Sequence, residues 1–224
     1  MKIGNWFHLN HQISDLNGEQ ILKEITLPKL KRNVDILIID DEDFPLLDEL
    51  KRHEFNIEYK NDITSLKDVE PYAIVLCDVH GVGKFLGSAQ EGAYLVSSIK
   101  EKYPSKTVIS YTADTTSPGA QKYLHHADYI FPKGTSIEDW ASLLTSSIKD
   151  IANPVFIWKK IQERLLQANV STRDVAYLES KYVKAIKKGK IESLSKLSND
   201  ETNPIKEILT CSIPLLLKIL KLIG

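Results

Sequence analysis

The sequence predicts an α/β protein in which a doubly wound, five-stranded parallel sheet is followed by an all-α module. Three observations support this prediction. Short apolar runs alternate with helical segments through the middle of the chain. Two of these runs, at 35–39 and 72–77, are almost continuously apolar, as strands buried on both faces are. After Asn153-Pro154 only helical spacing remains. We therefore expect an N-terminal extension (1–33), a central domain (34–152) and a C-terminal helical module (153–224).

Composition places the chain among ordinary globular proteins of 224 residues. The two cysteines, Cys77 and Cys211, lack metal-ligand spacing and argue against a disulfide framework. No secretory signal is visible, so we expect a cytoplasmic protein. Residues 34–154 carry 11 basic and 20 acidic side chains, whereas residues 155–224 carry 13 basic and 7 acidic ones. The basic tail could attract the acidic centre or face an anionic partner.

The expected elements of the first 152 residues follow from apolar spacing. In the N-terminal extension we predict one helix at 18–25, ended by Pro28. A helix at 44–50 would hold Pro45 in its first turn, where proline is tolerated. The predicted strands span residues 35–39, 55–59, 72–77, 107–111 and 128–131. The remaining predicted helices span residues 65–69, 93–103, 118–125 and 136–151.

Polar side chains stand at the ends of four of the five predicted strands. They are Asp40 with Asp41, then Asp78, Thr112 and Lys133. Because the carboxyl ends of parallel strands meet at one edge of the sheet, we expect these residues to converge. Three clustered carboxylates repel one another, and a divalent cation that prefers oxygen ligands, such as Mg²⁺, would compensate.

This set of residues could support phosphoryl transfer. A carboxylate can attack phosphorus if the charge on the phosphoryl oxygens is neutralised. The cation, Lys133 and the Thr112 hydroxyl could each engage one of these oxygens. A single residue of this kind is more often a helix cap, a turn residue or a solvated charge, but their combination favours a site. The glycines after Asp78 lack the GxxxxGK[ST] and GxGxxG spacings, which argues against nucleotide binding.

Over about residues 34–152 the chain resembles the receiver domains of two-component response regulators. The resemblance rests on the acidic pair after the first strand, Asp78 after the third, Thr112-Ala113 after the fourth and Lys133 after the fifth; Gly92 also fits. It implies a flavodoxin-like sheet of order 2-1-3-4-5 and phosphorylation of Asp78 by a histidine kinase or phosphotransfer protein. It also implies a Mg²⁺ site formed by Asp40, Asp41, Asp78 and the backbone carbonyl of His80.

The chain departs from the receiver pattern near its fifth strand. Receivers usually carry proline after the lysine, whereas Gly134 follows Lys133 here. The aromatic residue that usually switches stands three residues before the lysine, and that position is Ile130. The glycine-rich loop at 79–91 is also longer than usual, and we expect the phosphorylation-sensitive element there.

Two other classes of function stay open. A pseudo-receiver would act as a scaffold without taking a phosphoryl group. An aspartyl-phosphate phosphatase is the weakest hypothesis, because such an enzyme needs a second Asp two residues past the nucleophile and this chain has His80 there. We therefore do not expect an enzyme.

The C-terminal module is expected to contain helices at 155–166 and 171–188, then an apolar segment at 204–224 broken at Pro214. The lysines near the end of the second helix are interpreted as a solvated face, and no helix-turn-helix break is visible, so nucleic acid is an unlikely partner. The last segment is too short to span a bilayer. Burial in the core or in a homodimer is favoured over an interfacial membrane anchor.

Overall fold

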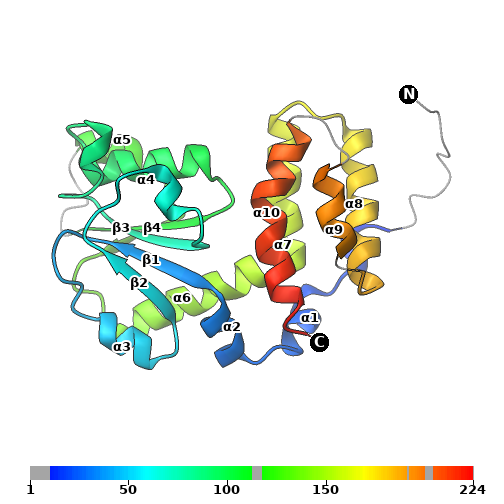
Figure 1. Ribbon diagram of the computed structural model, residues 1–224, viewed down its shortest axis with the longest axis horizontal. Helices are drawn as coiled ribbons and strands as arrows, with labels where there is room; N and C mark the ends of the chain where they lie inside the picture. The colour runs from blue at the N-terminus through cyan, green and yellow to red at the C-terminus, as the bar shows by residue number, and fades with distance from the viewer. Residues whose placement is uncertain (1–10, 113–117, 191, 200–203, 224) are drawn as a thin grey trace. The chain divides into compact units, whose positions relative to one another are not determined.

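A computed structural model describes residues 11–112, 118–190, 192–199 and 204–223 (Figure 1). The chain divides into two compact units. One is a continuous α/β unit, Leu27–Lys149. The other is a helical unit that joins the N-terminal segment up to Thr26 with the chain from Asp150 onward.

The α/β unit contains a five-stranded, all-parallel sheet in the order β2-β1-β3-β4-β5, which confirms the predicted fold class. Cα pairing sets Ile39 beside Cys77 and Asp78 beside Tyr111, so the carboxyl ends of the central strands lie level. The strands are β1 Asp35–Ile39, β2 Asn56–Lys60, β3 Ile74–Asp78, β4 Thr107–Thr112 and β5 Tyr129–Pro132.

Burial follows the position of each strand in the sheet. The central strands β1 and β3 lie in the core, and their apolar side chains are fully buried. This agrees with their nearly continuous apolar sequences, because helices cover both faces of such a sheet. By contrast, the edge strand β5 exposes Tyr129 and Ile130.

Helices lie on both faces of this sheet, with α4 and α5 on one side and α3 and α6 on the other (Figure 1). The helical elements of the unit are α2 Leu27–Asn33, α3 Leu47–Arg52, η3 Leu66–Val69, η4 Lys84–Leu86, α4 Glu91–Lys102, α5 Pro118–Leu124 and α6 Ile137–Ala152.

The predicted helix at 18–25 is found as α1, Gly18–Lys23, but the structure near two prolines differs from the prediction. A second helix, α2, was not predicted; Pro28 occupies its first turn, which needs no proline N–H. Helix α3 begins at Leu47, not at Phe44, and Pro45 lies in the preceding turn. Phe44 lies in the irregular segment before this helix, and its buried ring packs edge-on against Tyr111 at 5.4 Å.

The helical unit has its own hydrophobic core, centred on Trp158 and Tyr182. The Trp158 indole N–H donates to Glu179 at 2.8 Å, and the backbone N–H of Ile13 donates to the same carboxylate at 2.9 Å. The N-terminal segment is thereby anchored on α8. The elements are η2 Ile13–Asp15, α1 Gly18–Lys23, α7 Pro154–Gln167, α8 Thr172–Lys187, α9 Glu192–Asn199 and α10 Ile205–Leu220. Helix α9 had not been predicted.

Helix α10 continues through Pro214, so the predicted break at this proline was wrong. The helix buries apolar residues on both sides of the proline, among them Leu209, Ile213 and Leu216. This packing explains why the helix persists, because proline deletes one backbone hydrogen bond but leaves the apolar face intact. Across the described ranges no helix is both long and apolar enough to cross a bilayer.

Replacing Pro214 with alanine should therefore stabilise the helical unit. Pro214 is exposed, so the change removes little packing and restores a backbone donor. We expect the free energy of unfolding of this unit to rise by about 1 to 3 kcal/mol. Hydrogen exchange of peptides from α10 and α7 would measure it. A loss of protection would show that the proline shapes the helix for its packing.

Candidate functional site

Three carboxylates meet at the carboxyl edge of the sheet. Asp40 directly follows β1 and Asp78 ends β3, while Asp41 comes from the loop after β1. One oxygen from each lies within 4.8 Å of the others. Asp40 and Asp78 are each 2% exposed, whereas Asp41 is exposed. The sequence-predicted convergence of these three acids is found.

Lys133 supplies the positive charge at the same edge. Its Nζ lies 2.6 Å from Asp78 Oδ2 and 3.8 Å from Asp40 Oδ1. The backbone N–H of Lys133 donates to the carbonyl of Thr112 at 2.9 Å, which ties the ends of β4 and β5 together. Gly134, where receivers usually have proline, has φ of +92°, a conformation that favours glycine. The turn after β5 is thus built on glycine.

The electrostatics of the Asp78–Lys133 pair reflect opposing effects. Burial raises the pKa of Asp78, while its hydrogen bond and ion pair with Lys133 act in the other direction. The backbone N–H of Val79 also donates to Asp78 Oδ1 at 2.6 Å. Burial alone would lower the pKa of Lys133, but its hydrogen bond and ion pair with Asp78 outweigh this and raise it. Lys133 therefore carries its charge at neutral pH.

Asp40 is held by donors on both carboxylate oxygens. The backbone N–H of Glu42 donates to Oδ1 at 3.0 Å, and the Tyr111 hydroxyl donates to Oδ2 at 2.6 Å. Burial, followed by the hydrogen bond to Asp40, raises the pKa of Tyr111 far above its usual range, so the hydroxyl remains a donor. Tyr111 had not been predicted as a site residue. A tyrosine inside a buried strand was the available signal, since a buried tyrosine usually has a hydrogen-bond partner.

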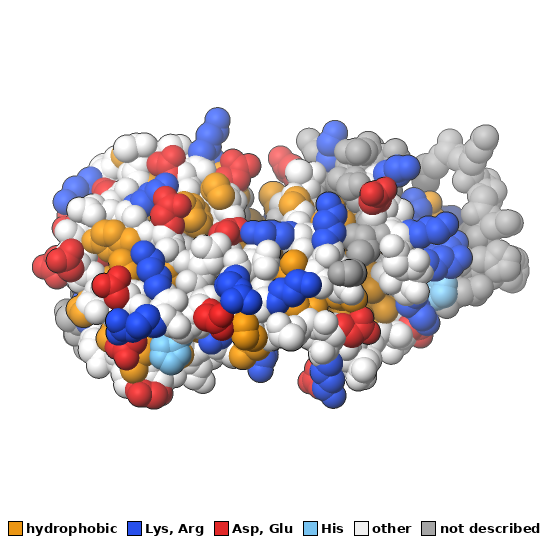
Figure 2. Space-filling view, turned by 60° about the horizontal axis from the view of Figure 1, so that its bottom comes forward, with side chains coloured by type: hydrophobic (Ala, Val, Ile, Leu, Met, Phe, Trp, Pro, Cys, Tyr) orange, Lys and Arg blue, Asp and Glu red, His pale blue; other side chains and the backbone are white. Residues whose placement is uncertain are grey.

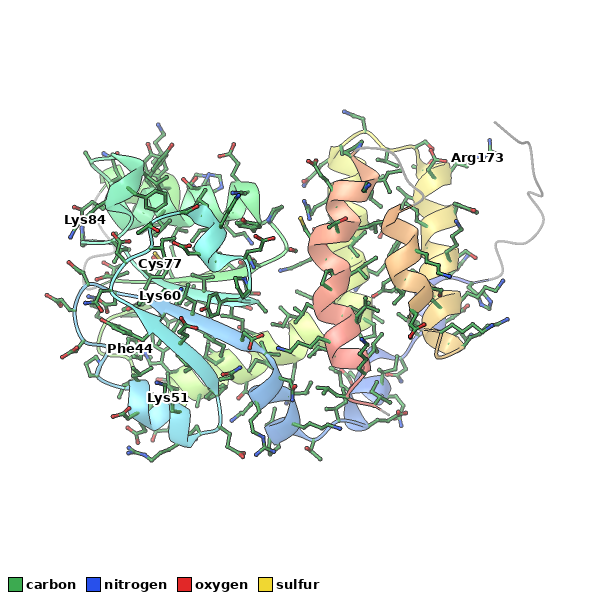
Figure 3. The ribbon with its side chains drawn as sticks, in the orientation of Figure 1. Phe44, Lys51, Lys60, Cys77, Lys84 and Arg173 are labelled. Carbon is green, nitrogen blue, oxygen red and sulfur yellow. The ribbon has the colours of Figure 1, made fainter. Side chains whose placement is uncertain are left out.

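The loop between β3 and α4 is attached to the rest of the unit by carboxylates. Asp62 accepts from the backbone N–H of Gly83 at 2.7 Å, and Glu91 accepts from that of Gly81 at 2.6 Å. Lys84 Nζ lies 3.8 Å from Asp41 Oδ2 (Figure 3 labels Lys84). The loop is therefore in contact with the acidic cluster, and its response to phosphorylation stays a prediction.

The remaining predicted site residues differ in how far the structure describes them. Thr112 is fully buried at the end of β4. Ala113 lies outside the described residues. The His80 side chain is exposed, and its imidazole is not part of the acidic cluster. A role for its backbone carbonyl as a cation ligand stays a prediction.

The fifth strand presents Ile130 to solvent at the expected switch position, with 44% exposure. Its neighbour Phe131 points to the other side and packs against Trp140 with ring centroids 4.9 Å apart. Phe131 is therefore held in a contact with α6, while Ile130 and the aromatic Tyr129 stand at the surface.

The donor set of the acidic cluster fits a hard divalent cation. All three candidate ligands are carboxylates, and oxygen-only ligand sets suit Mg²⁺, whereas structural zinc sites use nitrogen and sulfur. The Lys133 charge partly balances the cluster, while the exposed Asp41 lies near a second cation, the surface side chain of Lys84. The arrangement is therefore suited to a cation beside a nucleophilic carboxylate.

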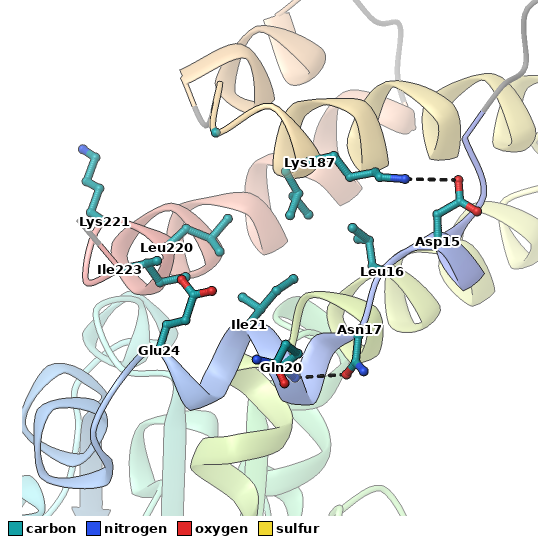
Figure 4. Close-up of a pocket in the computed structure, with 12 residues that line it drawn as sticks. Asp15, Leu16, Asn17, Gln20, Ile21, Glu24, Lys187, Leu220, Lys221 and Ile223 are labelled. Carbon is teal, nitrogen blue, oxygen red and sulfur yellow. Dashed lines mark hydrogen bonds and ion pairs between the residues drawn. The ribbon is translucent and has the colours of Figure 1, made fainter.

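A separate cavity of ≈ 540 Å³ lies in the helical unit (Figure 4). Its walls combine apolar side chains, such as Ile21 and Leu220, with an ion pair between Lys187 and Asp15 at 3.9 Å.

Basic side chains gather on one side of the helical unit, as Figure 2 shows. The exposed lysines of α8 and the turn after it agree with the predicted solvated face; they are Lys184, Lys187, Lys188 and Lys190.

No protein-family model and no curated protein matches the chain. Solved structures similar to it include a response regulator receiver domain protein (CheY-like) from Methanospirillum hungatei JF-1, with 20% identity, a TM-score of 0.42, and coverage of 51% of this chain and 93% of that one. A response regulator protein from Burkholderia pseudomallei, with a phosphorylated aspartic acid, calcium ion and citrate, has 20% identity, a TM-score of 0.40, and coverage of 64% and 91%.

A response regulator from Thermotoga maritima has 16% identity and a TM-score of 0.42, with coverage of 51% of this chain and 97% of that one. The expected resemblance to receiver domains is thus found among solved structures. At these identities the likeness concerns the fold alone. The helical module is not assigned to a family by these matches.

Proposed function

We propose that this chain is a receiver-type signalling protein that accepts a phosphoryl group on Asp78. The donor would be a phosphorylated histidine of a histidine kinase or phosphotransfer protein. One observation carries the proposal: a buried carboxylate, Asp78, lies 2.6 Å from an ammonium group and within 4.8 Å of two further carboxylates. A nucleophile, a charge-neutralising lysine and a potential cation site are thereby combined at one point.

In the proposed step a carboxylate oxygen of Asp78 attacks phosphorus. A bond between that oxygen and phosphorus forms as the phosphorus–nitrogen bond of the donor breaks, and the departing imidazole keeps the electron pair and takes a proton from water. The N–H of Val79 holds the orientation of the Asp78 carboxylate during attack. Lys133 is close enough to exchange its hydrogen bond with Asp78 for one with a phosphoryl oxygen.

Asp40, Asp41 and Asp78, together with the His80 carbonyl, would hold Mg²⁺ in this proposal. When bound, the cation would neutralise charge on the carboxylates and on the transferred phosphoryl group. The Thr112 hydroxyl, at the buried end of β4, would donate to a third phosphoryl oxygen. Output would pass through protein–protein contacts of the helical unit, including a homodimer through the C-terminal helices.

Intact-mass measurement after incubation with acetyl phosphate and Mg²⁺ tests this function. We expect one phosphoryl group per wild-type chain and none on the Asp78→Asn variant. Chelating the cation with EDTA should slow labelling strongly. Equal labelling of wild type and Asp78→Asn would show that Asp78 is not the acceptor.

A phosphorylation-independent scaffold is the second candidate function. The exposed Ile130 favours it, because an aliphatic residue occupies the position where receivers usually carry their switching aromatic. Such a protein would keep the fold and the partner contacts but would take no phosphoryl group. The absence of any mass increase on the folded wild-type chain would decide for this alternative.

A further inference from the structure

Tyr111 connects the acidic cluster to the aromatic core below it. Its hydroxyl donates to Asp40 Oδ2 at 2.6 Å, and both residues are 2% exposed. The hydrogen bond joins residues 71 positions apart in sequence. Water has little access to this bond, so solvent would not readily replace either partner if the other were removed.

The Tyr111 ring has little freedom to move. It packs edge-on against Phe44 at 5.4 Å and against Trp140 at 5.9 Å, with interplanar angles of 78° and 88°. Phe44 and Trp140 also contact each other at 5.8 Å, so the three rings form a closed cluster (Figure 3 labels Phe44). A hydroxyl carried on such a ring is a fixed donor that stays in place without an added entropic cost.

The hydrogen bonds at Asp40 define the orientation of its carboxylate. Glu42 donates to Oδ1, while Tyr111 donates to Oδ2, so rotation about the last side-chain bond would break both contacts. The Glu42 N–H and the Lys133 ammonium group both contact Oδ1, whereas the Tyr111 hydroxyl contacts Oδ2. Tyr111 is therefore the side chain that determines where the second oxygen of Asp40 points.

We propose that Tyr111 is a positioning residue for the cation site, holding Asp40 in the orientation in which it binds a divalent cation. This inference rests on the proposed function only in taking the acidic cluster as a cation site. Hydrogen-bond partners of metal ligands orient those ligands, and their loss typically weakens metal affinity by about 10- to 100-fold. Because the Glu42 contact remains, we expect the lower end of this range for Tyr111.

The test is calorimetric titration of the full-length chain with Mg²⁺, comparing wild type with Tyr111→Phe. This change keeps the ring and its packing but deletes the hydroxyl. We expect the dissociation constant to rise by about tenfold. Tyr72→Phe is the matched control, because the Tyr72 hydroxyl also donates to a carboxylate, that of Glu58, away from the acidic cluster. Its Mg²⁺ affinity should equal that of wild type.

Thermal unfolding in metal-free buffer separates positioning from a general loss of stability. Both variants lose one hydrogen bond to a carboxylate, so both should unfold at a somewhat lower temperature, yet only Tyr111→Phe should lose affinity. Equal or tighter Mg²⁺ binding by Tyr111→Phe would overturn the inference. If wild type binds no Mg²⁺, the inference fails together with the proposed cation site. If wild type binds Mg²⁺ but Asp78 takes no phosphoryl group, weakened binding by Tyr111→Phe still upholds the inference.

Discussion

Replacing Lys133 with methionine should destabilise the α/β unit by about 2 to 3 kcal/mol in metal-free buffer at neutral pH. Breaking a buried ion pair from one side typically costs about 3 to 5 kcal/mol, and we reduce this because the Lys133 side chain is 30% exposed. The variant would leave the Asp78 side chain, 4% exposed, and that of Asp40, 3% exposed, without their shared ammonium group. Urea unfolding followed by hydrogen exchange in β1 and β3 measures this unit alone.

Lys84→Met is the matched control for this experiment. Lys84 also faces a carboxylate of the cluster, at 3.8 Å from Asp41, but both side chains are exposed, at 63% and 38%. Such surface pairs contribute less than about 1 kcal/mol. Combining Lys133→Met with Asp78→Asn should recover much of the lost stability, because one buried charge is then removed. Equal stability of Lys133→Met and wild type would show that the cluster does not depend on this ammonium group.

The fold of the α/β unit was largely predictable because its strongest signals are local. A parallel strand that is buried on both faces must be apolar along nearly its whole length, and residues 36–39 of β1 and 74–77 of β3 form such runs. Helix α2 was missed because Pro28 has two opposite local meanings, a helix end or a helix first turn. Which meaning applies depends on whether a helix after Pro28 can bury its apolar side chains. In the structure it does, since Leu30 is only 2% exposed. Such burial depends on residues far away in the sequence, so the local pattern around Pro28 does not show it.

The candidate site was predictable to the same extent. Residues at the ends of parallel strands are brought together by topology, so Asp40, Asp78 and Lys133 could be grouped before their distances were known. The contact between Tyr111 and Asp40 could not be predicted in this way. A buried tyrosine requires some acceptor, but sequence does not say which of several nearby carboxylates and carbonyls it meets. Side-chain direction and ring packing decide that choice.

Gly92 is a second residue whose role could not be explained from sequence. It fits the receiver pattern, but the sequence gives no physical reason why glycine stands there. In the structure Gly92 lies in the first turn of α4, directly against the end of β3. A Cβ at this position would lie 2.0 Å from the carbonyl oxygen of Asp78 and 2.9 Å from the carbonyl carbon of Val79. Glycine is thus required because the helix approaches the backbone of Asp78, the proposed phosphoacceptor.

Replacing Gly92 with alanine should lower the free energy of unfolding of the α/β unit by about 3 kcal/mol or more. The atoms that a methyl group would meet belong to the backbone, so relief requires moving either α4 or the strand end that carries Asp78. Phosphoryl labelling of Asp78 should therefore fall in whatever fraction of the protein stays folded. Urea unfolding with hydrogen exchange in β3 and α4, combined with intact mass, measures both effects.

Gly87→Ala provides the comparison that isolates this close approach. Gly87 has φ of +64°, and a methyl group added there would meet no atom within 4 Å, so alanine costs only the strain of a left-handed conformation, about 1 to 2 kcal/mol. It also lies in the same loop region, between η4 and α4. A loss from Gly92→Ala no larger than that from Gly87→Ala would mean that α4 can shift away from β3 at little cost. Asp78 would then be held chiefly by Val79 and Lys133, whose contacts with its carboxylate do not involve the helix.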